Sequence, residues 1–240
     1  VILLHGYSAS GKLQDFYFGI SRRVNDFGFV LLVPEGMNDS KSEPFWNATD
    51  FCCDFEKTGV NDSAYLQALV AKVKIEYRID PKRVYLIGHS NGGFMANRLA
   101  CDTQGVFAGI VSLAGGTFKD LSNCPNQEAI PYLQIHAEND PVIAWSHDSR
   151  FMSGSETVDY WAKRNGCASA PEFEGQKDLI LSIPKIDTSI FRWSQCRSGA
   201  DVGLWKIRSY TSKLHKPHTP LLKSEFADGM LKFLLNYTRD

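Results

Sequence analysis

Residues 84–100, VYLIGHSNGGFMANRLA, change within a few positions from a run of aliphatic and β-branched residues to the apolar spacing of a helix. Ser90 lies at the junction, and Gly88 and Gly92 lie two positions to either side of it. A strand that turns at once into a helix pushes its corner residue toward strained backbone angles, and larger neighbours would collide there. The stretch therefore predicts a sharp strand–turn–helix that holds the Ser90 hydroxyl above a sheet edge, where a nucleophile would act. The alternative is a glycine-rich turn with a chance serine.

The rest of the chain alternates short apolar runs with helical patterns, which predicts an α/β fold with a mostly parallel central sheet and helices on both faces. The expected strands cover 1–5, 29–36, 83–88, 107–115, 131–137 and 202–210. The expected helices include 64–77, 155–166 and 224–238, with Ser155 as N-cap and Gly166 as stop of the second. Two further runs, 178–184 and 189–196, are expected to form a small antiparallel insertion before the last strand.

Composition limits the domain count and the partners. At 240 residues and 43% hydrophobic content, without a linker, the chain is expected to form one domain over 1–240. A formal net charge of -1 argues against nucleic acid as a partner, and no apolar stretch approaches the roughly 18 residues of a membrane span. The opening VILLHG already has the pattern of a buried strand, so we expect leading strands or a signal peptide upstream of the visible chain.

Six cysteines are many for a cytosolic enzyme, and none has the spacing of zinc ligands, since the nearest pair, Cys52 and Cys53, is adjacent. We therefore expect disulfides and a secreted or extracellular protein, with no metal site. For Cys52 and Cys53 themselves, a vicinal disulfide and two free thiols are both open. The alternative for the whole set is six reduced cysteines that pack as small hydrophobic residues.

Two cysteine pairs are expected to be neighbours. Cys101 ends the helix that starts at the Ser90 turn, and Cys124 precedes the strand near 131, so both belong at the same edge of a parallel sheet. Cys167 follows the helix stop and Cys196 lies just before the last strand, so this pair borders the antiparallel insertion.

In open parallel sheets, ligands bind at the carboxyl ends of the strands. His5 and Gly6 follow the first strand, and the glycine lets the next main-chain N–H, that of Tyr7, point into the same space as the N–H of Asn91. Two such donors are expected to form an oxyanion hole. Taken alone, the turn at His5 and Gly6 is better explained as an ordinary strand ending.

Further titratable residues follow the later strands. Asp140 comes after the strand at 131–137, and His215 and His218 come after the last strand. The order Ser, Asp, His is the one expected for an α/β-hydrolase triad, although an aspartate before a proline can also be only a turn former. The other histidines, at positions 5, 89, 136 and 147, are better explained by packing or hydrogen bonding. Position alone leaves both His215 and His218 open as the base.

Several segments together carry a family resemblance. LLHGYSASG, WNATDFCCDF, YRIDPKRVYLIGHSNGGFMANRLAC, QIHAENDPVI, ETVDYWAKRNGC and a late HTP resemble the polyhydroxybutyrate depolymerase and feruloyl esterase-like branch of the α/β-hydrolases, over nearly the whole chain. In that branch the base lies in a stretch like G-G-H-T-W-P, so the resemblance implies that the base is His218, which Thr219 and Pro220 follow. The sequence departs from the pattern because Lys216 and Pro217 replace the two glycines and the tryptophan is missing.

These residues predict a serine esterase. Ser90 would attack an ester carbonyl, His218 would take its proton, and Asp140 would stabilise the imidazolium, with no cofactor required. The expected partner is an ester substrate, polymers included. The resemblance implies feruloyl or acetyl esters of plant polysaccharide, or polyhydroxyalkanoate chains, and does not decide among them.

Trp46 and His89 are the expected substrate-binding residues. Trp46 would stack on an aromatic or sugar group, as the resemblance suggests, or else cover the sheet edge as a half-buried side chain. His89 adjoins Ser90, and a packing role is also open for it. The alternative to an enzyme is a non-catalytic binding module of the same fold, but all three triad positions are filled, which favours the enzyme. The oligomeric state stays open, with a monomer favoured.

Overall fold

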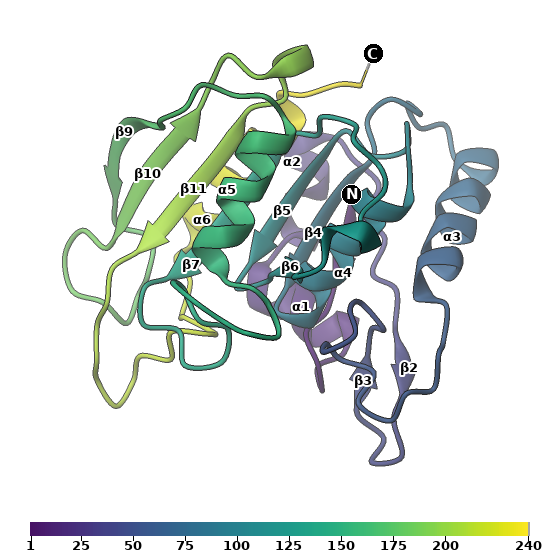
Figure 1. Cartoon of the computed structure of the whole chain (residues 1–240), viewed down its shortest axis with the longest axis horizontal. Helices are drawn as coiled ribbons and strands as arrows, with labels where there is room; N and C mark the ends of the chain where they lie inside the picture. Colours follow the sequence, from purple (N-terminus) through teal and green to yellow (C-terminus); the bar gives the residue numbers. More distant parts are fainter. Residues whose placement is uncertain (240) are drawn as a thin grey trace.

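A seven-stranded sheet forms the centre of the molecule (Figure 1). The computed structural model describes residues 1–239. The sheet has the order β1-β4-β5-β7-β11-β10-β9. The first five of these strands run parallel to one another, β10 pairs antiparallel with β11, and β9 pairs antiparallel with β10. The strands are β1 (Ile2–Leu4), β4 (Tyr85–His89), β5 (Gly109–Leu113), β7 (Tyr132–Ala137), β11 (Val202–Ile207), β10 (Thr188–Trp193) and β9 (Glu172–Lys177).

Helices cover both faces of this sheet, because successive side chains of a strand point to opposite sides and both sides are apolar. In β4, Leu86 belongs to one buried cluster and Ile87 to another. The first cluster packs under α3 (Asp62–Glu76), α4 (Asn91–Asp102) and α5 (Gly154–Arg164); the second packs under α1 (Gly11–Phe18), α2 (Val24–Phe27) and α6 (Ser224–Leu235). Figure 1 shows α5 in front of the sheet and α6 behind it, which confirms the predicted α/β architecture.

Smaller elements lie outside this sheet. Two short antiparallel pairs join β2 (Met37–Asn38) to β3 (Pro44–Phe45) and β6 (Thr117–Phe118) to β8 (Phe151–Met152). Single 3₁₀ turns cover 21–23, 121–123 and 197–199. Between residues 1 and 239 no helix combines the length and the apolar character needed to cross a membrane.

The strand expected at 29–36 is wrong except at one position. Leu32 bridges to Ile2, and the main chain of Leu32 exchanges two 2.9 Å hydrogen bonds with the first strand. Pro34 follows two residues later and has no N–H with which to continue the ladder. The Glu35 carboxylate instead accepts the N–H of Gly11, so this segment leaves the sheet and ties down the start of α1.

The N-cap of α5 lies two residues earlier than expected. Ser153, not Ser155, accepts the N–H of Glu156, and the Glu156 carboxylate accepts the N–H of Ser153 in return. This capping box is readable in the sequence as a serine followed three residues later by a glutamate. Gly166, with a φ of 64°, follows the helix end as expected.

The antiparallel insertion is confirmed, but one of its strands is misplaced. The strand that pairs with β10 is β9, whose side chains are mostly exposed, and not the apolar run at 178–184. Leu179, Ile180 and Ile183 in that run are buried in the cluster under α1 and α6. We call residues 178–183 the brace segment, because its main chain bonds to that of 221–223.

Three disulfides join all six cysteines. Cys101 pairs with Cys124 and Cys167 pairs with Cys196, which are the two pairs expected from the sequence. The remaining pair is a vicinal disulfide between Cys52 and Cys53. Disulfides persist in oxidising environments and are rare in the cytosol, so this set is consistent with an exported protein.

Candidate active site

The turn between β4 and α4 has the geometry that its glycines predict. Ser90 has a φ of 52° and a ψ of -120°, a conformation that a residue with a side chain adopts only when its surroundings enforce it. A Cβ atom on Gly88 would overlap the main chain of Gly92, and a Cβ on Gly92 would overlap the carbonyl of Leu4. The close packing of β1, β4 and α4 therefore requires both glycines and holds the serine at the carboxyl end of β4.

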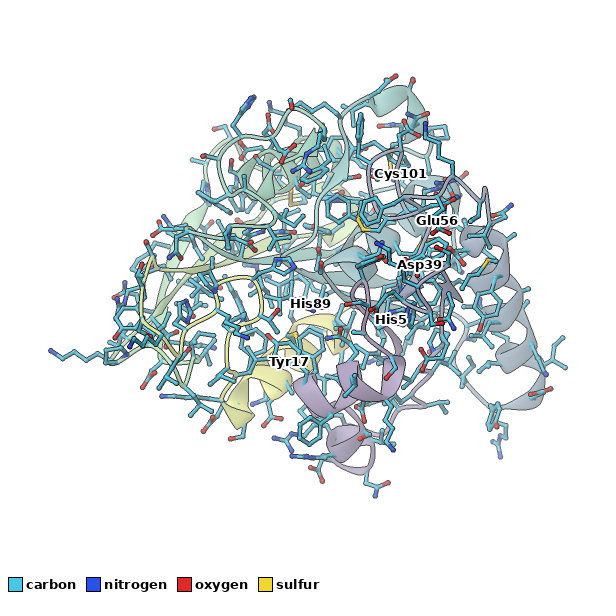
Figure 2. All side chains as sticks on the ribbon, turned by 90° about the horizontal axis from the view of Figure 1, so that it is seen from below. His5, Tyr17, Asp39, Glu56, His89 and Cys101 are labelled. Carbon is cyan, nitrogen blue, oxygen red and sulfur yellow. A yellow bond between two sulfur atoms is a disulfide. The ribbon has the colours of Figure 1, made fainter. Side chains whose placement is uncertain are left out.

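Three side chains from separate segments meet at this turn. The His218 Nε2 atom lies 2.9 Å from Ser90 Oγ, and the His218 Nδ1 atom lies 2.9 Å from Asp140 Oδ2. Asp140 follows β7, and His218 lies in the connection between β11 and α6. The arrows of β5 and β11 point down in Figure 1, so the carboxyl ends of the parallel strands are at the bottom, and Figure 2 views the molecule from that end.

The Asp140 carboxylate is held from both sides. Its Oδ1 atom accepts the N–H groups of Val142 and Ile143 at 2.8 and 3.1 Å, while Oδ2 accepts from His218. Burial acts to raise the pKa of Asp140, but the hydrogen bond and charge of His218, with smaller effects from His136 and Val142, lower that pKa below its ordinary value. An ionised Asp140 can only accept, so His218 carries its proton on Nδ1 and offers a free Nε2 lone pair to Ser90.

His89 lies behind His218 and lines the same pocket. Its Nε2 atom is 2.9 Å from the carbonyl oxygen of His218, and the ring centroids are 5.3 Å apart. Burial, followed by the neighbouring His218, lowers the pKa of His89 to about 4, so this ring is neutral and donates to that carbonyl. Figure 2 labels His89 beside Tyr17, whose ring lies 5.5 Å away and whose hydroxyl donates to the carbonyl of Pro220. His89 and Tyr17 thus hold the main chain on both sides of Thr219.

His215, the other histidine left open by the sequence, is bonded elsewhere. Its Nδ1 atom lies 2.8 Å from Ser182 Oγ in the brace segment, and its ring packs edge-on against Tyr210. It makes no hydrogen bond to Ser90 or Asp140 within residues 1–239. The structure therefore brings His218, and not His215, to the serine.

A pocket of about 270 Å³ opens beside Ser90. Its walls include Tyr7, Leu13, Gln14 and Tyr17. Leu13, Gln14 and Tyr17 come from α1, and the sequence reasoning missed them; the available signal was a helix pattern directly after HG, with Ser10 as its N-cap. In the described part of the chain, the main-chain N–H groups of Tyr7 and Asn91 donate to no protein acceptor, as an oxyanion hole requires.

The expectation that Trp46 binds substrate is wrong. Its side chain is fully buried, its Nε1–H donates to the carbonyl of His5 at 3.0 Å, and its ring lies 4.7 Å from that of His5. Its main chain holds the amide of Asn91 through two hydrogen bonds of 2.7 and 2.8 Å. Trp46 therefore supports the residue after the serine from inside the core, where no substrate can reach it. Within residues 1–239 no three His, Cys, Asp or Glu side chains lie together so that they could hold a metal ion.

Comparisons with known proteins agree with this architecture. Residues 1–160 match the sequence model of the Phospholipase/Carboxylesterase family. A putative esterase NocK of Nocardia uniformis subsp. tsuyamanensis is 30% identical over 141 residues, or 59% of this chain and 40% of that protein. A probable feruloyl esterase C of Aspergillus terreus is 27% identical over 162 residues, or 67% of this chain and 51% of that protein.

The solved structures include one of similar size. The acetyl xylan esterase from Aspergillus awamori superposes with a TM-score of 0.62 at 15% identity, over 97% of this chain and 87% of that chain. At this identity the likeness concerns the fold. The chain spans about half, or less, of the length of the two curated relatives above. The family match covers the segments that carry Ser90 and Asp140, and the chain belongs to the Phospholipase/Carboxylesterase family of α/β-hydrolases.

Proposed function

We propose that the protein is a serine esterase that hydrolyses carboxylic esters through Ser90, His218 and Asp140. The observation that carries the proposal is the unbroken chain of two 2.9 Å contacts from Ser90 Oγ through His218 to a buried, ionised carboxylate. Ser90 and His218 line a pocket that is large enough for an ester group.

The reaction has two stages. His218 Nε2 takes the hydroxyl proton as Ser90 Oγ bonds to the ester carbonyl carbon, and the main-chain N–H groups of Tyr7 and Asn91 donate to the resulting oxyanion. The imidazolium, stabilised by Asp140, then gives its proton to the leaving alcohol, which leaves an acyl-serine. Water, deprotonated by the same imidazole, attacks the acyl carbon; the bond to Ser90 Oγ then breaks, the imidazolium returns its proton to that oxygen, and the carboxylic acid leaves.

The proposed substrates are feruloyl or acetyl esters of plant polysaccharide, or polyhydroxyalkanoate chains, met outside the cell. Support comes from the names of the related feruloyl and acetyl xylan esterases and from the three disulfides. The pocket wall from α1 is largely apolar, with Leu13 and Tyr17 beside the serine, which suits an aromatic or aliphatic acyl group.

A substrate panel with the Ser90→Ala variant tests the proposal. Purified protein is assayed on p-nitrophenyl acetate, methyl ferulate, acetylated xylan and a polyhydroxybutyrate film, and is labelled with a fluorophosphonate. We expect turnover of at least one ester and labelling at Ser90, both lost in Ser90→Ala, since removal of a triad nucleophile costs roughly 10⁶-fold in kcat. Activity above about 1% in that variant would exclude Ser90 as the nucleophile. An unlabelled wild-type protein that cleaves none of the esters would favour the non-catalytic binding module.

A further inference from the structure

The connection between β11 and α6 carries His218 but has no helix or strand of its own around that residue. On the side of the sheet, His89 donates to the carbonyl of His218 and Tyr17 donates to the carbonyl of Pro220. These two bonds hold the main chain of residues 218 and 220 near the carboxyl end of β4. They do not hold the two arms of the loop that lead into and away from these residues.

The brace segment holds the arm of the loop that follows His218. The N–H of Leu181 donates to the carbonyl of Leu221 at 2.7 Å, and the N–H of Lys223 donates to the carbonyl of Leu179 at 2.9 Å. Ile180 and Leu222 form an antiparallel bridge between these two bonds. The main chain is thus fixed from three residues after His218 onward.

A side-chain contact holds the other arm. His215, three residues before His218, bonds through Nδ1 to Ser182 Oγ at 2.8 Å. Between 211 and 219 His215 is the one buried residue, and its neighbour Leu214 is 78% exposed. The buried Nε2 atom of His215 has no hydrogen-bond partner within residues 1–239. Because Nε2 is unpaired, the contact with Ser182 is the one hydrogen bond that the His215 ring makes within residues 1–239, and its loss would leave both ring nitrogens unpaired.

The brace segment is itself firmly anchored. Its apolar side chains, Leu179, Ile180 and Ile183, are buried under α1 and α6. The buried Asp187 carboxylate accepts the N–H groups of Leu179 and Ile180 at distances between 2.9 and 3.1 Å. A loop tied to this segment is therefore tied to the core of the molecule.

We propose that Ser182 and His215 are positioning residues for His218. Their hydrogen bond holds the arm that leads into His218, as the main-chain pairing with 221–223 holds the arm that leaves it, so the imidazole keeps both of its 2.9 Å contacts. This inference rests on the proposed function. A small displacement of a reacting group can cost on the order of 10- to 100-fold in rate, while substrate binding on the α1 wall is untouched.

Steady-state kinetics of Ser182→Ala and His215→Leu on p-nitrophenyl acetate test the proposal. Both variants are expected to lose on the order of tenfold or more in kcat with little change in KM, and to react more slowly with a fluorophosphonate. Ser182→Thr and His215→Asn keep a hydrogen-bonding group near the same position and are expected to recover most of the lost kcat. Ser209→Ala is the matched control, because Ser209 lies in the same connection, is exposed and bonds only through its main chain.

Melting temperatures separate positioning from folding. If Ser182→Ala and Ser182→Thr have the same kcat as wild type, the proposal is wrong. It is also wrong if kcat falls only in proportion to the folded fraction, or if KM rather than kcat changes. The two failures are distinguishable: if wild type is active and Ser90→Ala is not, while the Ser182 variants keep the wild-type kcat, only the positioning proposal is wrong, whereas an inactive wild type contradicts the esterase itself.

Discussion

The imidazole of His218 lies between a group that only accepts and a group that donates. Asp140 takes the Nδ1 proton, and the Ser90 hydroxyl points its proton toward Nε2. Each partner comes from a different part of the chain: glycine packing fixes the turn that holds Ser90, and the N–H groups of Val142 and Ile143 hold the Asp140 carboxylate. The tautomer of one ring is therefore determined by the placement of three loops.

Asp140→Asn tests this tautomer. The amide would still fill the site and would accept the N–H groups of Val142 and Ile143, but it would present a donor or a weak acceptor to His218. We expect a folded protein whose kcat falls by about 10⁴-fold, because the imidazole would turn its lone pair away from the serine. Esterase kinetics and circular dichroism measure the two effects, and a near-normal rate would assign the role to another carboxylate, Asp148 being the first to test.

A comparison of the two loop histidines tests which is the base. His218→Ala is expected to lose roughly 10⁶-fold in kcat, as Ser90→Ala does, because the two groups act as a unit. His215→Ala removes only a positioning contact and is expected to cost no more than about 100-fold. Reversed effects in a kcat measurement would move the base to His215 and would contradict the geometry at Ser90.

At the level of elements, apolar runs located the strands whose two faces are both covered. β1, β5, β7 and β11 lie within segments expected from the sequence, and β4 passes the end of its expected segment, 83–88, by one residue; burial on both faces leaves an unbroken apolar run in each. β9 has one neighbour and exposed side chains, so its polar EFEGQK gave no such signal. The brace segment gave a false strand signal, because a buried segment that packs without pairing in the sheet has the same apolar composition as a strand.

The site was predictable where one local motif or the chain order determines it. Ser90, Asp140 and His218 could be chosen from the turn glycines, the strand ends and the late HTP. The burial of Trp46 was not predictable, because it depends on a contact between residues far apart in the sequence, the main chain of Trp46 and the side-chain amide of Asn91. The α1 wall of the pocket was missed for the same reason: which face of a helix meets the serine is decided by packing and not by local pattern.

The two long-range disulfides join elements at their ends. One ties the last turn of α4 to the segment before β7, and the other ties the end of α5 to the end of β10. They close loops with sequence separations of 23 and 29 residues, and such loops stabilise a fold by about 3 kcal/mol each if unstrained.

Removal of one bridge at a time tests this contribution. Cys101→Ser with Cys124→Ser, and separately Cys167→Ser with Cys196→Ser, are each expected to lower Tm by about 10 °C. Calorimetry measures the shift, and reduction of the wild-type protein should produce at least as large a change. An unchanged Tm in both double variants would mean that these bridges do not limit the stability of the chain.

For the whole molecule, buried histidines make stability depend on pH. Burial lowers the pKa of His5, His89 and His136, and that of His89 falls to about 4. An unfolded histidine has a pKa near 6.5, so between about pH 4 and 6.5 the unfolded chain binds more protons than the folded one. The contribution of these neutral histidines to the free energy of unfolding is therefore fully present above about pH 6.5 and is lost as the pH is lowered through this window.

Thermal melts between pH 8 and pH 4 measure this loss. We expect Tm to be nearly constant above about pH 7 and to fall steadily below it. His89→Gln should flatten part of that slope, because its amide can still donate to the carbonyl of His218 without titrating. His147→Gln, at an exposed position, is the control and should keep the full slope. A Tm that rises on acidification would show that some other group dominates.

The placement of β9 at one edge of the sheet affects whether strands of separate molecules can pair. An outermost strand offers unpaired N–H and C=O groups to any other chain, and a flat apolar one invites fibrils. Here that position is filled by a strand with exposed Glu172 and Lys177, a positive φ of 116° at Gly175, and a register shift between the positions opposite Ile190 and Phe191. The apolar strands β7 and β11 are thereby kept away from neighbouring molecules, so at this side of the sheet no apolar strand edge is open to pairing with a second copy of the chain.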